Sequence, residues 1–493
     1  MLFTTAQFAF VFMPLVLLVF FLTGLRSPYW AAGSLFIASV VFYSFASLQL
    51  TVLLLSSIVV NFLIGTRTAK AQLPAAARAW MIAGVGANLA ALAYFKYAGF
   101  LVNGVLGPLT AGLHFHPPPL PVGISFYTFT QIAYQVDTYQ RKVKEYRPIH
   151  YGLFVTFFPH LVAGPVLHHA QMMPQFQQAQ TYRLNMGNAA AGLAIFAMGL
   201  LKKVIIADYM SPYADAVFNA AARGAAPTSL EAWVAALAYT FQLYFDFSGY
   251  SDMAVGLSWM LNIRLPFNFN SPYQALSVSD FWRRWHMSLS TFLRDYLYIP
   301  LGGSRHGPVR RYVNLAVTML LGGLWHGASW TFVWWGGLHG IYLGINHAFR
   351  AAAGGIIERL DRSRVFALLS WSLTFLSVIA AWVFFRATTF SAAERILRAM
   401  VMQPHLGAPA ESNLLLWNVG LDPTTGLLAC ALLGLIAVAA PNSNVIGEWV
   451  HARCLASSRV RALVTGFALA FVVLLVVLNE SRSSVSAFIY FNF

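Results

Sequence analysis

Charge is scarce in this chain. Asp, Glu, Lys and Arg make up 10% of its 493 residues, while hydrophobic residues make up 58%. Soluble domains carry about 25% charged residues, so a water-soluble domain is excluded as the main architecture. Because a membrane-spanning helix needs about 20 apolar residues, the chain has room for many spans. We therefore predict an all-α, polytopic membrane protein.

Cysteine and acidic residues are also few. The only cysteines are Cys430 and Cys454, so no disulfide framework is implied. Lys and Arg number 31 against 16 Asp and Glu, which gives a net charge of +15. The basic residues lie in short clusters between apolar runs, as the positive-inside rule describes. We therefore expect contact with the bilayer rather than with nucleic acid.

The apolar runs predict about 11 to 13 transmembrane helices. We expect residues 1–479 to form a single membrane domain and residues 480–493 to form a short tail. Gly249 and Gly256 interrupt the long run 230–262, which can be broken there. The predicted helices cover residues 8–25, 30–46, 49–65, 79–95, 120–136, 150–166, 188–206, 230–262, 313–330, 332–349, 365–386, 425–440 and 461–479. The first run has no basic segment before it, so we expect it to stay in the protein as a helix.

Basic clusters set the predicted orientation. They are Arg67, Lys70 and Arg78 before the fourth helix, and Arg453, Arg459 and Arg461 before the last one. The rule places both clusters in the cytoplasm and both termini outside it, although Arg482 in the tail argues slightly against this. We expect a bacterial cytoplasmic (inner) membrane protein.

The segment 280–311 is the densest charge cluster. Leu289, Phe292, Leu293 and Tyr296 recur at helical steps, which suits an amphipathic helix along the membrane. The arginines of the segment are Arg283, Arg284, Arg294, Arg305, Arg310 and Arg311. They can meet phosphates of an acyl carrier or simply anchor lipid headgroups. His286, beside Trp285, is either an interfacial histidine or a catalytic one.

His326 lies in an apolar stretch that begins near Val313. An ionisable group there is a candidate functional residue, and histidine suits proton transfer near neutral pH. The alternative is an interhelical hydrogen bond. Thirteen positions later, His339 lies about 220° further round an ideal helix, which predicts a packing role.

Two carboxylates fall in the apolar run 230–262. Asp246 and Asp252 can orient a histidine, line a polar tunnel, or bond backbone freed by a helix break. Their six-residue spacing puts them on different faces of a helix. The loop histidines His114, His116, His168 and His169 lack the spacing of a helical zinc site, so no metal site is predicted.

Several short motifs occur in one order along the chain. They are LPVGISFY at 120–127, FFPHLVAGP at 157–165, QLYFDFSGYSDMA at 242–254, FWRRWH at 281–286, YLYIPLGG at 296–303 and GLWHG at 323–327. Together the chain resembles the membrane-bound O-acyltransferase family, in its bacterial branch typified by alginate O-acetyltransferase. The resemblance covers residues 90–350.

The resemblance implies a ring of tilted helices around a tunnel that crosses the membrane. It implies His326 as the central catalytic residue and His286 as a second tunnel residue. The chemistry agrees, since a neutral imidazole can take a hydroxyl proton as a thioester carbonyl is attacked. Trp325, Ser329 or a backbone N–H near Gly327 can stabilise the oxyanion.

The chain ends in the aromatic sequence AFIYFNF at 487–493, which can be an interfacial anchor. It also resembles the C-terminal signature of bacterial cell-surface acylation systems, in which a tyrosine relays the acyl group. That resemblance implies Tyr490 as an acyl relay.

The leading hypothesis is a polysaccharide O-acetyltransferase. Acetyl-CoA is the expected donor substrate, with no permanently bound cofactor, and an extracytoplasmic SGNH-type acetyltransferase is the expected partner. That partner would carry acetyl to a glycan such as alginate, cellulose or peptidoglycan. Two alternatives are an acyltransferase supplied by a D-alanyl carrier protein and a transporter of a glycan or lipid precursor, which the absence of repeat symmetry disfavours.

Overall fold

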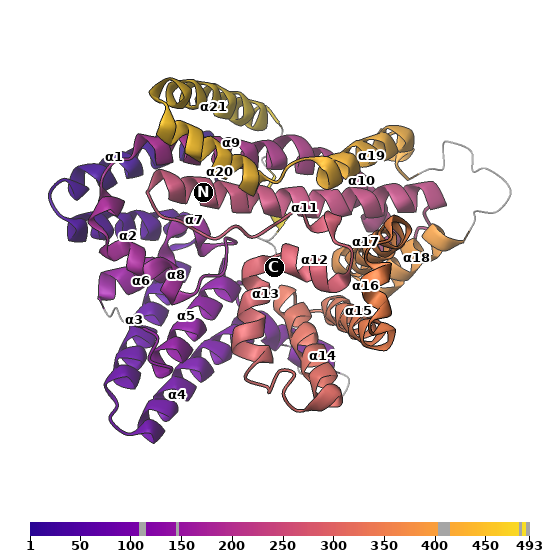
Figure 1. Ribbon diagram of the computed structural model, residues 1–493, viewed down its shortest axis with the longest axis horizontal. Coiled ribbons are helices and arrows are strands. Elements are labelled where there is room, and N and C mark those ends of the chain that lie inside the picture. The colour runs from indigo at the N-terminus through magenta and orange to yellow at the C-terminus, as the bar shows by residue number, and fades with distance from the viewer. Residues whose placement is uncertain (108–114, 144–146, 403–414, 483–485, 490–493) are drawn as a thin grey trace. The chain divides into compact units, whose positions relative to one another are not determined.

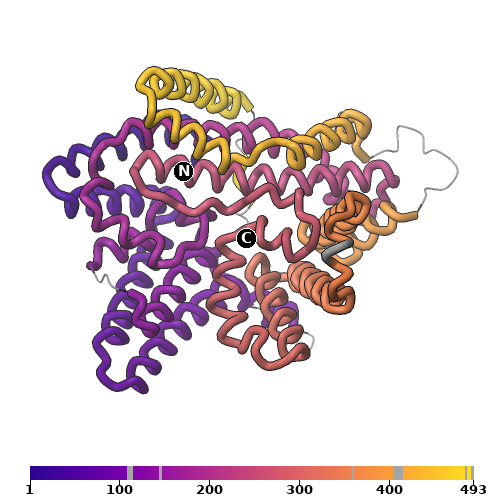
Figure 2. The backbone as a smooth tube through the Cα atoms, in the orientation of Figure 1, coloured from indigo at the N-terminus to yellow at the C-terminus, as the bar shows by residue number. Residues whose placement is uncertain are grey.

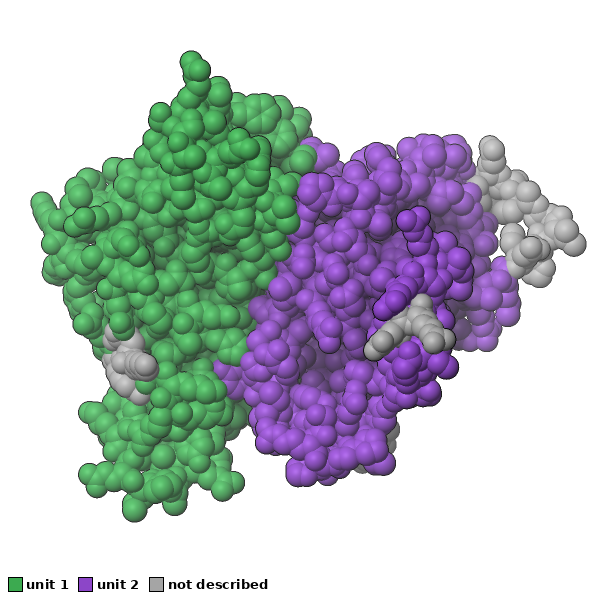
Figure 3. Space-filling view, in the orientation of Figure 1, with its two compact units in different colours: residues 1–201, 249–267, 443–492 green, residues 202–248, 268–442, 493 purple. Residues whose placement is uncertain are grey.

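Helices make up all the regular structure in the part of the chain that the computed structural model describes, residues 1–107, 115–143, 147–402, 415–482 and 486–489. They form two compact units (Figure 3). Unit 1 consists of residues 1–201, 249–267 and 443–492, and unit 2 of residues 202–248, 268–442 and 493. The prediction of one membrane domain over 1–479 stays a prediction.

Unit 1 holds the first and last helices of the chain. Its α-helices are α1 (Met13–Gly24), α2 (Pro28–Ser44), α3 (Leu48–Lys70), α4 (Pro74–Leu92), α5 (Ile124–Tyr139), α6 (Pro148–Thr156), α7 (Phe158–Leu161), α8 (His169–Met172), α9 (Met186–Leu201), α20 (Ser443–Ala456) and α21 (Ser458–Glu480). Short π- and 3₁₀-helices add Gln7–Phe12, Ala93–Tyr97, Phe100–Val105, Met173–Gln177 and Ala179–Tyr182. The first five α-helices can be followed in Figure 2 from the indigo end of the tube.

Unit 2 is built mainly from the middle of the chain. Its α-helices are α10 (Asp208–Ala222), α12 (Val278–Arg284), α13 (Met287–Leu293), α14 (Gly307–His326), α15 (Trp330–Ala353), α16 (Ile356–Leu360), α17 (Arg364–Arg386), α18 (Phe390–Val401) and α19 (Pro423–Ala439). Short helices add Lys202–Ala207, Pro272–Gln274, Arg294–Tyr298 and Trp417–Val419. Helix α11 (Ser229–Met260) contributes its first part to unit 2 and its last part to unit 1 (Figure 1).

Six helical stretches in the described residues are long and apolar enough to cross a membrane. They are Gln7–Gly24, Leu48–Lys70, Pro74–Tyr97, Met186–Ala222, Arg364–Arg386 and Ser458–Glu480, and α19 with α20 is apolar enough for a further one. The protein is therefore a multi-pass, all-α membrane protein, as the composition predicts. The ring of helices and its tunnel stay predictions.

Local sequence explains where these helices begin. The Ser27 hydroxyl accepts the backbone N–H of Tyr29, and Pro28 occupies the first helical position of α2. Proline is well placed there because its missing N–H would have no partner inside the helix. Ser47 caps α3 in the same way, accepting from Leu50 N. Most of the predicted apolar helices begin within about six residues of the observed ones. The predicted helix 150–166 is wrong, because the chain leaves the helix at Phe157 and forms the two short helices α6 and α7, the second ending at Leu161.

Helix α11 is continuous, so the expected break near Gly249 is absent. Both of its glycines serve close packing instead. A Cβ atom on Gly199 of α9 would lie 2.5 Å from the carbonyl oxygen of Gly249, and one on Gly256 would lie 2.5 Å from that of Gly192. These glycines let the backbones of α9 and α11 approach within unit 1, which is a known use of small residues in membranes.

A buried amide network ties α3, α4 and α5 together in unit 1. The side chains of Asn61 and Asn88 exchange two hydrogen bonds, at 2.6 and 3.3 Å. Gln135 Nε2 donates to the backbone and side-chain oxygens of Asn61. Amide groups paired across helices in this way hold the helices in one register where the surroundings are apolar.

The N-terminal segment contacts the end of α21 within unit 1. Asn479 Nδ2 near the end of α21 donates to the carbonyl oxygen of Thr4 at 3.1 Å. The backbone N–H of Ala6 donates to Glu480 Oε1 at 3.0 Å. The N-terminal segment and the end of the last helix therefore lie side by side.

Candidate active site

His326 is the last residue of α14, at the turn into α15. Gly327 leaves the helix in an extended conformation, and Ser329 starts α15 as its N-cap residue. The two helices meet backbone to backbone, since a Cβ atom on Gly323 would lie 2.3 Å from the carbonyl oxygen of Phe332. This close packing buries His326, whose side chain is 2% exposed.

Aromatic rings form the surroundings of His326. The ring centroids of Trp325, Trp335 and Phe385 lie 4.9, 5.1 and 5.2 Å from that of His326, all edge-on. Such a wall excludes water, and exclusion of water strengthens electrostatic interactions with any reacting group beside the imidazole.

His286 lies in the turn between α12 and α13 and is fully buried. Its backbone adopts a left-handed conformation, with φ of 43°. A non-glycine residue in this region costs about 1 kcal/mol or more and persists only when its neighbours enforce it. Asn268 does so, because its carbonyl oxygen accepts the N–H of Met287 at 2.9 Å.

The side chain of Asn268 also fixes the proton on His286. Its Oδ1 accepts from the backbone N–H of Ser288 at 3.1 Å and from the Ser288 hydroxyl at 2.9 Å, which identifies it as the amide oxygen. The same oxygen lies 3.2 Å from His286 Nδ1, so Nδ1 must donate. The neutral ring therefore keeps the lone pair on Nε2, the form that can accept a proton.

His286 and His326 come together within unit 2, with ring centroids 6.4 Å apart. Trp325 contacts both rings, at 6.1 and 4.9 Å. The turn that carries His286 lies outside the six candidate spans, and burial lowers the pKa of this imidazole. The geometry thus brings a histidine held in its neutral, proton-accepting form together with a second histidine that is buried among aromatic rings.

The other candidates from the basic segment have different surroundings. Arg284 Nε contacts the Asp280 carboxylate at 3.0 Å, one helical turn away. Arg283 is exposed. Trp285 is buried in an aromatic cluster, 4.9 Å from Trp382 and stacked on Phe281 at 5.6 Å. The segment predicted to be an amphipathic helix forms α13 and the short π-helix Arg294–Tyr298 that follows it.

The two carboxylates take partners from different elements. Asp246 accepts a hydrogen bond from the buried Lys203 ammonium at 2.7 Å, and Lys203 also pairs with Asp208 at 2.8 Å. Asp252 accepts from the Ser443 hydroxyl at 3.1 Å in unit 1. The sequence suggested three roles for Asp246, and an ion pair with a lysine was not one of them.

Ser329 and Tyr490 complete the predicted set. The Ser329 hydroxyl lies 2.8 Å from the Thr331 hydroxyl, within hydrogen-bonding distance. Tyr490 lies outside the described residues, whereas Phe488, two positions earlier, is 1% exposed. Sequence reasoning missed Asn268 and Lys203, although both are polar residues beside apolar runs, which is a usable signal in a membrane protein.

Comparison with known proteins identifies the family of this chain. The MBOAT, membrane-bound O-acyltransferase family matches residues 49–352. A peptidoglycan O-acetyltransferase of Helicobacter pylori is 38% identical over 100% of this chain and 98% of its own length. A probable alginate O-acetylase AlgI of Pseudomonas aeruginosa is 43% identical over 81% of this chain and 75% of its own length. A teichoic acid D-alanyltransferase of Bacillus subtilis is 28% identical over 46% of this chain and 60% of its own length.

The chain therefore belongs to the membrane-bound O-acyltransferase family. Within it, the relatives that match most of its length make it a membrane O-acetyltransferase. The family prediction from the ordered motifs is confirmed.

Proposed function

We propose that the protein takes an acetyl group from cytoplasmic acetyl-CoA and passes it through Tyr490 to an extracytoplasmic partner, which O-acetylates a cell-surface polysaccharide. The observation that carries the proposal is the buried pair of His286 and His326, 6.4 Å apart. One imidazole would act as the base that acyl transfer requires, and the second would hold or pass on the proton.

The chemical step is a transfer from a thioester to a hydroxyl. The hydroxyl oxygen of Tyr490 bonds to the acetyl carbonyl carbon while His326 takes the hydroxyl proton. The carbon–sulfur bond then breaks, and the departing thiolate of CoA receives that proton. The products are a tyrosine acetyl ester and free CoA, and a hydroxyl of the partner takes the acetyl group in a second, similar exchange.

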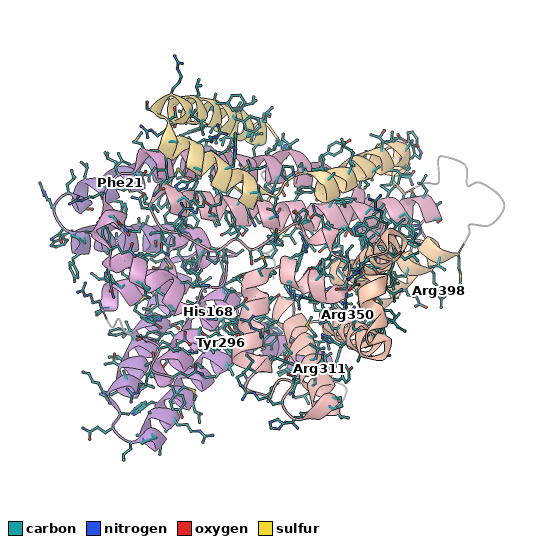
Figure 4. All side chains as sticks on the ribbon, in the orientation of Figure 1. Phe21, His168, Tyr296, Arg311, Arg350 and Arg398 are labelled. Atoms are coloured by element: carbon teal, nitrogen blue, oxygen red, sulfur yellow. The ribbon has the colours of Figure 1, made fainter. Side chains whose placement is uncertain are left out.

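A cluster of basic side chains in unit 2 supports an anionic donor. Arg283 of α12 and Arg311 of α14 both act electrostatically on His347 of α15, which brings three basic groups into one neighbourhood. Figure 4 labels Arg311. Arginine binds phosphate with two parallel hydrogen bonds, so this cluster suits the phosphates of CoA.

The anchored tail supports the relay. Phe488 packs edge-on against Tyr250 at 4.8 Å, and Tyr250 stacks on Phe3 at 5.1 Å. The described part of the tail is therefore held within unit 1 by a buried ring two positions before Tyr490 in the sequence. The contacts of Thr4 and Ala6 with Asn479 and Glu480 also bring the N-terminal segment beside the end of α21, and we propose that both lie on the extracytoplasmic side of the bacterial inner membrane.

The acceptor is proposed from the relatives. The relative that aligns over the whole chain is named for peptidoglycan and others are named for alginate, so we propose an extracytoplasmic polysaccharide of this kind. An SGNH-type acetyltransferase would be the partner that reaches it.

The test is to incubate the purified protein with isotope-labelled acetyl-CoA and map the label by peptide mass spectrometry. We expect label on Tyr490 in the wild type and none in His326→Ala or Tyr490→Phe, with all three proteins folded. A folded His326→Ala variant that labels normally would contradict the role of His326. A parallel incubation uses a D-alanyl carrier protein that carries labelled D-alanine. If only this second donor labels the protein, the carrier protein and not acetyl-CoA is the donor.

The acceptor is tested in cells. A strain that lacks the protein is complemented with wild type or His326→Ala, and ester-linked acetate is measured on peptidoglycan and on secreted polysaccharide separately. Restoration by the wild type alone identifies the glycan. Full acetylation in the uncomplemented strain would contradict the proposed function.

A further inference from the structure

His339 on α15 is a fully buried histidine that the proposed reaction does not yet use. Trp282 Nε1 donates a hydrogen bond to His339 Nδ1 at 3.2 Å. Because an indole N–H is only a donor, Nδ1 must be the acceptor, so the neutral ring carries its proton on Nε2. In the described part of the chain, His339 Nε2 has no hydrogen-bond partner.

Trp335 lies one helical turn before His339 on the same face of α15, and it is also fully buried. Its indole Nε1 likewise has no hydrogen-bond partner among the residues that the structure describes. The Trp335 ring touches both histidines, at 5.1 Å from His326 and 4.9 Å from His339. Trp335 therefore carries a buried N–H donor on a ring that contacts the candidate base, and His339 carries a second one on a ring that contacts Trp335.

Buried donors without acceptors are rare, because each one costs about 1–3 kcal/mol of desolvation. Such donors persist at functional sites where a ligand supplies the acceptor. Attack on a thioester carbonyl places a negative charge on its oxygen, and N–H groups held ready in a water-free site stabilise that charge most effectively.

We propose that Trp335 Nε1–H and His339 Nε2–H bind the carbonyl oxygen of the acyl thioester and stabilise the oxyanion that forms during transfer. The inference rests on the proposed acyl transfer at His326. As the hydroxyl oxygen bonds to the carbonyl carbon, the π electrons of the carbonyl move to its oxygen between these donors. They return when the carbon–sulfur bond breaks, and no proton leaves Trp335 or His339.

The test compares variants that change the donors but keep the packing. Trp335→Phe keeps a ring that can stack on Trp382 and removes the N–H, while His339→Leu removes the second donor. His339→Gln keeps an N–H near the position of Nε2. Trp334→Phe is the matched control, since Trp334 is the adjacent residue and is 47% exposed.

The readouts are single-turnover acetyl transfer, acetyl-CoA affinity and melting temperature. We expect Trp335→Phe and His339→Leu to slow transfer about 100-fold or more, with the affinity for acetyl-CoA and the melting temperature little changed. We expect His339→Gln to recover much of the rate and Trp334→Phe to retain all of it.

Two results would overturn the inference. One is full-rate transfer by folded Trp335→Phe, and the other is an equal loss of rate in His339→Gln and His339→Leu at unchanged melting temperature. If His339→Leu does not fold, Trp335→Phe and His339→Gln still decide. The proposed function fails separately, if the wild type transfers no acetyl or if His326→Ala transfers it normally.

Discussion

Asn268 holds His286 in one tautomer, with Asn268 Oδ1 3.2 Å from His286 Nδ1. The same oxygen accepts two hydrogen bonds from Ser288, so it cannot rotate away without losing them. A short polar loop therefore presets the lone pair on His286 Nε2 before any substrate binds. The free-energy cost of orienting the His286 imidazole is therefore met during folding and not when the substrate binds.

The Asn268→Asp variant tests this relationship through pH. In the wild type, burial lowers the pKa of His286, so the ring is neutral at physiological pH. A carboxylate at position 268 would favour the imidazolium and raise that pKa. We expect the variant to lose transfer activity as pH falls from about 8 to about 6, while the wild type changes little over this range. A pH profile identical to that of the wild type would contradict the role of Asn268.

Phe488→Ala tests the tail anchor. Loss of the buried ring removes its contact with Tyr250, which holds the described part of the tail in unit 1. We expect acetyl transfer to Tyr490 to fall at least about 10-fold, while cleavage of acetyl-CoA continues because unit 2 is unchanged. Ile489→Ala is the control at the adjacent, half-buried position. Equal labelling of Tyr490 in wild type and Phe488→Ala would show that the anchor is dispensable.

Arg283→Gln and Arg311→Gln test the basic cluster. We expect each to weaken binding of acetyl-CoA by about 1.5–3 kcal/mol, since each removes a charge-assisted hydrogen bond to phosphate. The exposed Arg305 provides the control Arg305→Gln. Titration of binding by calorimetry separates the three variants, and an equal small loss in all of them would indicate general attraction of charge instead of a site.

Lys203→Met tests the buried ion pairs of unit 2. The change leaves Asp246 and Asp208 without their shared cation, and both side chains are almost fully buried. Breaking a buried pair in this way typically costs about 3–5 kcal/mol. We expect a large drop in melting temperature, which Lys203→Met combined with Asp246→Asn would partly restore. The exposed pair of Glu394 and Arg398 gives the control Arg398→Ala, with little expected change.

Gly256→Ala tests the close packing of α9 against α11. The added methyl group would lie 2.5 Å from the carbonyl oxygen of Gly192 and 2.6 Å from the backbone nitrogen of Phe196, so the helices must separate. We expect destabilisation of about 1–3 kcal/mol. In α21, a Cβ atom on Gly466 meets nothing within 4 Å. Gly466→Ala should therefore be neutral or stabilising, and a similar loss in both variants would contradict the packing argument.

The sequence predicts the helices well because a bilayer demands long apolar runs, and those runs are visible without any tertiary information. It also identifies His286, His326 and Trp325, which the structure brings together. The long helix α11 shows the limit of such reasoning. A glycine in an apolar run signals either a break or a close contact, and only the partner helix α9 decides between them.

His339 shows a second limit. The angle of about 220° between His326 and His339 applies only if both residues lie on one continuous helix. In the structure, α14 ends at His326 and α15 begins at Trp330. The turn between them reorients the second helix, so that Trp335 contacts both histidines. The partner of Asp246 was equally out of reach, because Lys203 lies far from it in the sequence and an ion pair leaves no periodic signal.

The contact between the N-terminal segment and the end of α21 has a consequence for biosynthesis. More than 470 residues separate Thr4 and Ala6 from their partners Asn479 and Glu480, so the ribosome makes the two sides of this contact at widely separated times. Unit 2 consists almost entirely of residues 202–442, so it can assemble while translation continues. Unit 1 also needs α20 and α21, so its first helices stay incompletely packed in the membrane until these two helices have been synthesised.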